Sequence, residues 1–252
     1  MPTSPDYSIR RFQIDGHDLG YPTEFRGGCS SIGMFVVSAS RANELIADSG
    51  FTVAELAPGK ALLSLTCVHY SDSDFGAYEE IALAFFVNKA GAKWRLPYMS
   101  NCLDLLQGKV ASYTWRLPVT TTLARDAGIK MWGFPKTVES IDFSRDAGRA
   151  NFFWRSGDDS VLSYSVADKG SREPDAFTTS VYSVYEKKHR VSYLTQSYHE
   201  SSYQLRGAKL QLGSHAISDE LRSLGLKTRP LLAVWNGRLA FTMSAPERIY
   251  DW

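Results

Sequence analysis

The chain has 252 residues, of which 44% are hydrophobic and 22% charged, as in a soluble globular protein with one large or two small domains. Its formal net charge is +1 and the charges are dispersed, which gives no electrostatic basis for binding nucleic acid or an anionic membrane. No segment approaches the ~20 apolar residues of a membrane helix, and residues 1–10 lack the apolar core of a signal peptide.

Cysteine and histidine spacing predicts neither a disulfide framework nor a metal site. Cys29, Cys67 and Cys102 are far apart and form no C-x-x-C pair, which indicates a reducing cytoplasm. The five histidines are also scattered, without H-x-H or H-E-x-x-H spacing. His215 follows Gly213-Ser214, and we interpret it as a turn residue rather than a catalytic base.

Periodicity and capping residues predict two helices with strands between them. The first helix spans residues 40–48, with Ser38 or Ser40 as its cap and Gly50 as its stop. Alternating, β-branched and aromatic residues predict strands at residues 61–70, 80–87, 110–119, 160–166 and 178–185. The second helix spans residues 219–224, between Ser218 as its cap and Gly225 as its stop.

Short polar and glycine-containing segments predict the turns. Gly27-Gly28 and Gly157-Asp158-Asp159 are predicted turns, and the basic cluster at residues 187–190 is a solvated turn or strand end. Asn236-Gly237 lies between two apolar runs, which predicts a hairpin over residues 231–242.

Many strands and few helices, without an internal linker, predict a single domain over residues 1–252. We expect a mainly β fold, in which curved antiparallel sheets form a closed barrel with few short helices. A barrel of this size can enclose a cavity for a small ligand.

The hexapeptide Met131-Trp132-Gly133-Phe134-Pro135-Lys136 places a lysine after an apolar, backbone-restricted segment. Apolar surroundings favour the neutral form of an amine, and a neutral amine attacks carbonyl groups. Gly133 permits an unusual φ, and Pro135 fixes its own φ and holds Phe134 extended. Lys136 is therefore either a nucleophile presented from a rigid strand end or bend, or an edge lysine whose stem covers aromatic surface.

A second candidate is Glu80 in Gly76-Ala77-Tyr78-Glu79-Glu80, at the start of an apolar strand. Strand alternation places Glu80 on the face of Ala82, where an inward carboxylate needs a partner or a function. Alternatively, Glu79 and Glu80 form a solvated strand start.

These segments resemble the acetoacetate decarboxylase superfamily. The pattern G-x-x-x-x-G-F-P-K, ending at Lys136, is similar to its active-site segment, and Gly76-x-Tyr78-x-Glu80 is similar to its glutamate segment. The region of Ser214-His215-Ala216 and the C-terminal residues 246–252 also fit, so the resemblance spans essentially the whole chain.

The resemblance implies a cone-like barrel with the lysine in an apolar cavity, a homo-oligomer, and no metal or organic cofactor. Lys136 would form an imine with the substrate, and Glu80 would orient the substrate or move protons. Tyr78, Trp132 and Phe134 would line the substrate pocket.

Three positions depart from the decarboxylase pattern. Thr137 stands where the decarboxylase has a second lysine, so the cation that would help to activate the nucleophile is missing. Lys130 stands where the pattern has an acidic residue, roughly 20 Å from Lys136 if the segment is extended. Arg26 is the nearest candidate for the arginine of the decarboxylase site, although the alignment also permits Ser30 or Ser31 there.

The resulting functional hypothesis is a Schiff-base lyase acting on an oxo acid or ketone, foremost by decarboxylation of a 3-oxo acid through an imine and an enamine on Lys136. The alternatives are a Schiff-base aldolase-dehydratase acting on 2-oxo acids and a non-catalytic barrel that binds a small ligand. A structural or interaction protein, suggested by the aromatic content of 13%, comes last.

Overall fold

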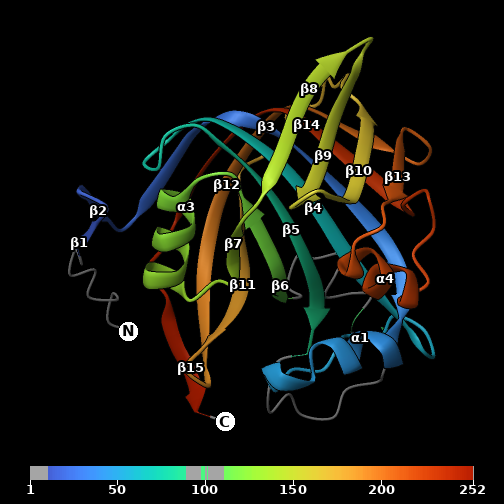
Figure 1. Ribbon diagram of the computed structural model, residues 1–252, viewed down its shortest axis with the longest axis horizontal. Coiled ribbons are helices and arrows are strands. Elements are labelled where there is room, and N and C mark those ends of the chain that lie inside the picture. Colours follow the sequence, from blue (N-terminus) through green and yellow to red (C-terminus); the bar gives the residue numbers. More distant parts are fainter. Residues whose placement is uncertain (1–10, 89–97, 100, 102–110, 252) are drawn as a thin grey trace.

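A large antiparallel sheet curls around most of the molecule (Figure 1). The computed structural model describes residues 11–88, 98–99, 101 and 111–251, so that Cys102 and the predicted strand start at residue 110 lie outside the described residues. The strands of the large sheet are β3 (Thr23–Ser38), β4 (Lys60–Ser73), β5 (Tyr78–Val87), β6 (Ala111–Val119), β7 (Lys136–Val138), β11 (Phe177–Tyr185), β12 (Lys188–Gln204), β14 (Leu232–Met243) and β15 (Glu247–Asp251).

This sheet closes on itself. Its order is β11-β12-β14-β3-β4-β5-β6-β7, and β11 also pairs with β6, in parallel, at Val181↔Ser112 and Tyr182↔Tyr113. The strands from β6 to β11 therefore form a ring, which confirms the mainly β fold class with few short helices. All the strands predicted from periodicity are present, and β4 extends beyond its predicted limits at both ends.

A second, four-stranded sheet covers one face of the ring. Its order is β13-β10-β9-β8, with β8 (Ser140–Asp146), β9 (Arg149–Ser156), β10 (Asp159–Ala167) and β13 (Ala208–Leu212). Trp154 and Tyr164 of this sheet pack with Leu65, Leu83 and Trp235 of the large sheet in the larger hydrophobic cluster. A two-stranded hairpin, β1 (Arg11–Ile14) and β2 (His17–Gly20), contributes to a separate cluster on the ring.

The described helices are short, and none is long and apolar enough to cross a membrane. They are α1 (Ala39–Leu45), the 3-10 turn η1 (Ala47–Ser49), α3 (Thr122–Ala127), the π-helical turn η2 (Gly128–Trp132) and α4 (Ala216–Ser223). Ser38 caps α1, and Gly50 ends the segment with φ 71°, as predicted. The α4 prediction was wrong at its start: His215 caps the helix, whereas Ser218 lies inside it and donates to the Val161 carbonyl at 2.7 Å.

Two glycine-containing turn predictions were wrong because neighbouring strands occupy both sides of the segment. β14 continues through Asn236-Gly237, where the Asn236 amide accepts from Ser201 Oγ at 2.8 Å and donates to Ser30 Oγ at 3.1 Å. These bonds hold the residue between β12 and β3 instead of in a turn. Gly27-Gly28 lies within β3 at an irregularity in its pairing with β4. The turn at residues 157–158 is present as predicted.

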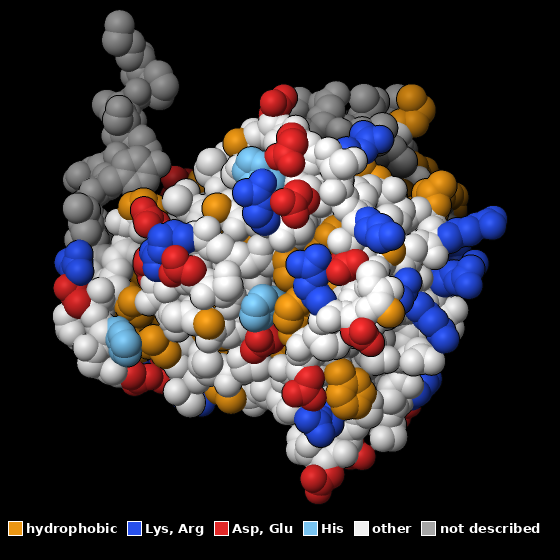
Figure 2. Space-filling view, turned by 90° about the horizontal axis from the view of Figure 1, so that it is seen from above, with side chains coloured by type: hydrophobic (Ala, Val, Ile, Leu, Met, Phe, Trp, Pro, Cys, Tyr) orange, Lys and Arg blue, Asp and Glu red, His pale blue; other side chains and the backbone are white. Residues whose placement is uncertain are grey.

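The basic cluster at residues 187–190 lies at a turn and strand start, as predicted, because β12 begins at Lys188. The prediction that the cluster is solvated was wrong for His189, which is buried with its ring stacked on Phe51. Figure 2 shows basic and acidic side chains interleaved over one face of the molecule, with several basic ones toward one edge. This distribution agrees with the dispersed charge of the sequence.

Candidate functional site

A buried ion pair joins the two segments that the sequence singled out. Lys136 begins β7, and its Nζ lies 2.7 Å from Oε2 of Glu80 on β5. The two side chains are only 6% and 12% exposed. Charged side chains are rarely buried without such a partner, because their desolvation is costly. An amine and a carboxylate in this contact can exchange a proton, and the neutral amine can then attack a carbonyl carbon.

Two tyrosines complete the polar cluster around Glu80. The Tyr70 hydroxyl donates to Glu80 Oε1 at 3.2 Å, while Lys136 binds the other carboxylate oxygen. Tyr70 lies opposite Tyr78 in the β4–β5 ladder, and their rings are 4.6 Å apart. Sequence reasoning missed Tyr70, since its contact with Glu80 depends on the register between two strands.

Burial dominates the electrostatics of both phenols. It raises the pKa of Tyr70 and of Tyr78 well above the ordinary value, and the Glu80 charge raises both further. The Tyr78 ring faces Lys136, with Nζ 5.5 Å from its centroid. Its hydroxyl lies close to Tyr70 and Glu80, and hydrogen bonding with each of them contributes to the shifted pKa of Tyr78. A buried phenol beside the amine is suited to donate to an oxygen atom of a bound molecule.

The lysine stem rests against a glycine in the preceding helical segment. A Cβ added to Gly128 would lie 2.4 Å from Lys136 Cδ and 2.6 Å from Cε, so the absence of a side chain makes room for the stem. The chain returns from η2 to β7 through Gly133, which has φ 74° and a Cβ position 2.4 Å from Tyr185 Cβ. Gly133 therefore has the unusual φ that the hexapeptide suggested, and it also permits a close approach to Tyr185.

Trp132 and Phe134 form an aromatic wall beside this turn. Their rings are 6.3 Å apart and both residues are buried. Trp132 Nε1 donates to the Ser244 carbonyl at 2.8 Å, which fixes the indole against the end of β14. The ring centroid of Phe75 lies 6.2 Å from that of Trp132 and 6.4 Å from that of Tyr78. The aromatic wall is therefore continuous with the rings around Lys136.

Arg26 is not brought to this cluster by any described contact. Its side chain is 43% exposed, and its guanidinium binds Asp72 and Asp74 at 2.9 and 2.7 Å and reaches Glu24 at 3.5 Å. Hydrogen bonding to Arg26 lowers the pKa of Asp72. A role in binding a substrate carboxylate stays a prediction for Arg26.

The structure also gives the locations of the other positions discussed for the decarboxylase pattern. Thr137 is exposed on β7, and Lys130 is exposed on η2 near Asp126. Because residues 128–132 form a helical turn, the separation of roughly 20 Å that an extended segment would give does not apply. Ser30 lies in register with Val68, which pairs with Glu80, whereas Ser31 donates to the Val234 carbonyl at 2.9 Å.

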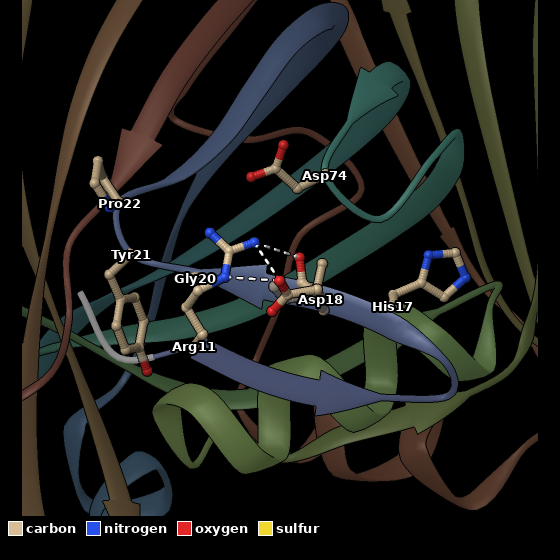
Figure 3. A pocket seen from close by; sticks show the side chains of 8 residues that line it. Arg11, His17, Asp18, Gly20, Tyr21, Pro22 and Asp74 are labelled. Atoms are coloured by element: carbon tan, nitrogen blue, oxygen red, sulfur yellow. Dashed lines mark hydrogen bonds and ion pairs between the residues drawn. The ribbon is translucent and has the colours of Figure 1, made fainter.

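A separate surface pocket of about 400 Å³ lies beside the β1–β2 hairpin (Figure 3). Its lining includes Arg11 and Asp18, which form an ion pair at 2.6 Å, and it does not include Lys136. Among the described residues, no group of three or more His, Cys, Asp or Glu could hold a metal ion.

Comparison with known proteins identifies a matching family model and similar folds. Residues 21–251 match the family model described as acetoacetate decarboxylase (ADC). The fold is similar to a structure from structural studies of acetoacetate decarboxylase, at 14% identity and a TM-score of 0.69, covering 92% of this chain and 90% of that one. An acetoacetate decarboxylase from Legionella pneumophila gives 14% identity, a TM-score of 0.68, and coverage of 92% and 88%.

The same fold occurs in a protein with a different description. The enduracididine biosynthesis enzyme MppR, solved in complex with pyruvate, is 14% identical, with a TM-score of 0.59 and coverage of 92% of each chain. MppR has also been solved with the condensation product of pyruvate and imidazole 4-carboxaldehyde. No curated protein matched the sequence. At these identities, the structural similarities show a common fold.

Proposed function

The chain belongs to the acetoacetate decarboxylase (ADC) family, and from this and its buried lysine–glutamate pair we propose that it is a Schiff-base-forming lyase acting on an oxo acid. Decarboxylation of a 3-oxo acid is the reaction we favour. The observation that carries the proposal is the 2.7 Å contact between Lys136 Nζ and Glu80 Oε2 in a site where both side chains are nearly inaccessible.

In the proposed reaction, Glu80 accepts a proton from the Lys136 ammonium, and the neutral amine adds to the substrate carbonyl. Loss of water gives a protonated imine. The electron pair of the bond to the carboxylate then moves into this imine as CO₂ departs, which leaves an enamine. Protonation of the enamine carbon and hydrolysis release the ketone and restore the amine. Glu80, held by Tyr70, is placed to return the proton.

The pair holds the amine and a base in contact before a substrate binds. An approaching carbonyl that displaces Lys136 Nζ from Glu80 leaves the carboxylate free to take up the proton. The described contacts of Lys136 include no cation that would take the place of the second lysine of the decarboxylase pattern.

A Schiff-base aldolase-dehydratase acting on 2-oxo acids is the second candidate. Thr137 at the position of the second lysine and the fold shared with MppR favour it, because the MppR complexes contain pyruvate and a pyruvate condensation product. Both reactions pass through an imine and an enamine on the same lysine, so the substrate distinguishes them. A non-catalytic barrel that binds a small ligand is the third candidate function.

Borohydride trapping tests the proposal. Wild type and Lys136→Met are incubated with a panel of 2-oxo and 3-oxo acids, reduced, and analysed by intact mass and peptide mapping. We expect a reduced adduct at Lys136 in wild type alone. If the substrate is decarboxylated, the mass of the adduct is lower, by the mass of CO₂, than the mass calculated for an adduct of the intact acid. If a 2-oxo acid binds without decarboxylation, the adduct has the mass calculated for the intact acid.

Lys130→Met, which removes an exposed lysine of the same segment, is the matched control and should trap as wild type does. Absence of an adduct at Lys136 with every acid would contradict the Schiff-base proposal and favour the binding barrel.

A further inference from the structure

The two faces of the large sheet beside Glu80 differ in exposure. On the face away from Glu80, Ile81, Cys67 and Trp235 are completely buried in the cluster shared with the small sheet. On the Glu80 face, the next residues along the strands are only half-buried: Ala82, Thr66, Ile32 and Val234. Something other than the small sheet must therefore cover this second face if it is to be shielded from water.

Strand register places these residues in one row. Ala82 pairs with Thr66, Thr66 with Ile32, and Ile32 with Val234, without an irregularity in this part of the ladders. Residues directly opposite one another on antiparallel strands share a face, as do residues two apart on one strand. Glu80 and Ala82 therefore lie on the same face.

A second row continues in the same direction. Ser64 and Met34 are paired, and each lies two residues beyond a member of the first row. The hydrogen-bond distance of 3.3 Å between Ser64 Oγ and Thr66 Oγ1 agrees with a shared face. We name these residues the uncharged strip: Ala82, Thr66, Ile32, Val234, Ser64 and Met34.

The strip begins at the reacting groups and leads away from them. With a rise of 3.3–3.4 Å per residue, the two rows extend about 13 Å from Glu80 along β5. None of its members carries a charge. At the outer end of the first row, the Arg172 guanidinium lies 5.5 Å from the ring centroid of Tyr203, the partner of Val234.

From this continuity we infer that the strip binds the uncharged tail of the substrate, so the substrate is an oxo compound bearing an aliphatic or arylalkyl chain of about six to ten carbons. The assignment of its carbonyl to Lys136 rests on the proposed function. Burying such a chain against the half-buried apolar members of the strip, which are Ala82, Ile32, Val234 and Met34, is favourable. A charged tail would lose hydration without a charged partner in the strip.

The test compares ketones that differ only in chain length. Butan-2-one and decan-2-one are trapped on Lys136 with borohydride over a concentration series. Because each fully buried methylene multiplies affinity about fourfold, we expect half-maximal trapping by decan-2-one at a concentration at least tenfold lower, even with partial burial. Ala82→Phe, which fills the strip, and Ile32→Gln, which makes it polar, should reduce this ratio toward one without abolishing trapping of butan-2-one.

Val138→Gln is the matched control, since it changes an aliphatic residue that is 40% exposed on β7 and lies outside the strip. It should retain the wild-type ratio. Equal trapping of the two ketones by wild type, or an unchanged ratio in both strip variants, would overturn the inference while leaving the proposed function intact.

Calorimetric binding of decan-2-ol, which cannot form an imine, separates the two proposals. Tight binding that weakens at least tenfold in Ala82→Phe supports the tail site even if no ketone is trapped, in which case only the proposed function fails. Sedimentation velocity, which measures the oligomeric state, tests the competing explanation. If wild type is a dimer that Tyr203→Asp dissociates, and if decan-2-ol does not bind, the strip is an interface between two copies of the chain. That result would overturn the inference.

Discussion

At the scale of single residues, the site depends on side chains that hold one another. Glu80 is bound through one oxygen by Tyr70 and through the other by Lys136, so its carboxylate plane is fixed from two sides. Tyr70 is in this respect a positioning residue for the pair. Gly128 has the complementary role, because the lysine stem occupies the space where a side chain would stand.

Gly128→Ala should therefore disturb Lys136 more than it disturbs the fold. Gly128 has helical φ and ψ of −60° and −39°, at which alanine is favoured over glycine by up to about 1 kcal/mol. The new methyl would overlap Lys136 Cδ and Cε, which belong to a flexible side chain and can move. We expect the unfolding free energy to stay within about 1 kcal/mol of wild type while borohydride trapping falls strongly.

Lys130→Ala, in the same turn, should leave trapping unchanged because that side chain is exposed. Normal trapping by the Gly128→Ala protein would show that the stem does not need the glycine. Loss of folding in that variant would instead show that the backbone, rather than the Lys136 side chain, has to move to relieve the overlap.

At the scale of elements, α3 and η2 place the lysine. Thr121 caps α3 by accepting from the Ala124 amide at 3.3 Å, η2 continues the helix as a π-helical turn, and Gly133 ends it. Phe134 N then donates to the Gly128 carbonyl at 3.1 Å, which folds the approach to Lys136 back on the helix. The position of Lys136 along β7 is thus tied to the geometry of one short helical segment.

Removing its cap tests this dependence. Thr121→Ala should lower the unfolding free energy by about 1 kcal/mol, the usual cost of losing an N-cap side chain. It should also slow trapping at Lys136, because the segment that positions the lysine becomes less rigid.

Ser38→Ala removes the corresponding cap of α1, a helix that packs in the other hydrophobic cluster. Chemical denaturation should show a similar loss of stability, with trapping at the wild-type rate. Equal trapping in the two variants would mean that α3 stabilises the protein without positioning Lys136.

At the scale of the whole molecule, ring closure buries phenols from several strands. Burial raises the pKa of Tyr70 on β4, Tyr78 on β5 and Tyr198 on β12. In the unfolded chain these phenols ionise from about pH 10. Above that pH the folded protein retains protons that the unfolded chain releases, so stability must fall as the pH rises.

Each such phenol steepens the decline by up to about 1.4 kcal/mol per pH unit. Denaturation between pH 9 and 11.5 should therefore show a falling free energy of unfolding, with a shallower slope for Tyr70→Phe than for wild type. Tyr203→Phe, which alters a residue that is 55% exposed, should keep the wild-type slope. A Tyr70→Phe slope equal to that of wild type would contradict the assigned burial effect.

Local patterns in the sequence determined the fold class, the strands with clear alternation, the first helix and its glycine stop. They also singled out Lys136, Glu80 and Tyr78 as candidates. Each of these residues belongs to a short motif of neighbouring residues, which can be recognised without knowing the tertiary structure. α3 and η2 escaped prediction since six-residue and five-residue segments carry too few turns to show helical periodicity.

Tertiary structure alone decided which residues meet across strands. Asn236-Gly237 is a hairpin signal by itself, but β3 and β12 supply hydrogen-bond partners on both sides and keep it extended. Tyr70 contacts Glu80, and the uncharged strip forms, only because of the register between neighbouring strands. That register depends on interactions along the whole length of the paired strands and cannot be inferred from one segment. The sequence thus singled out one lysine and one glutamate as candidates, while ring closure decided their contact and what surrounds it.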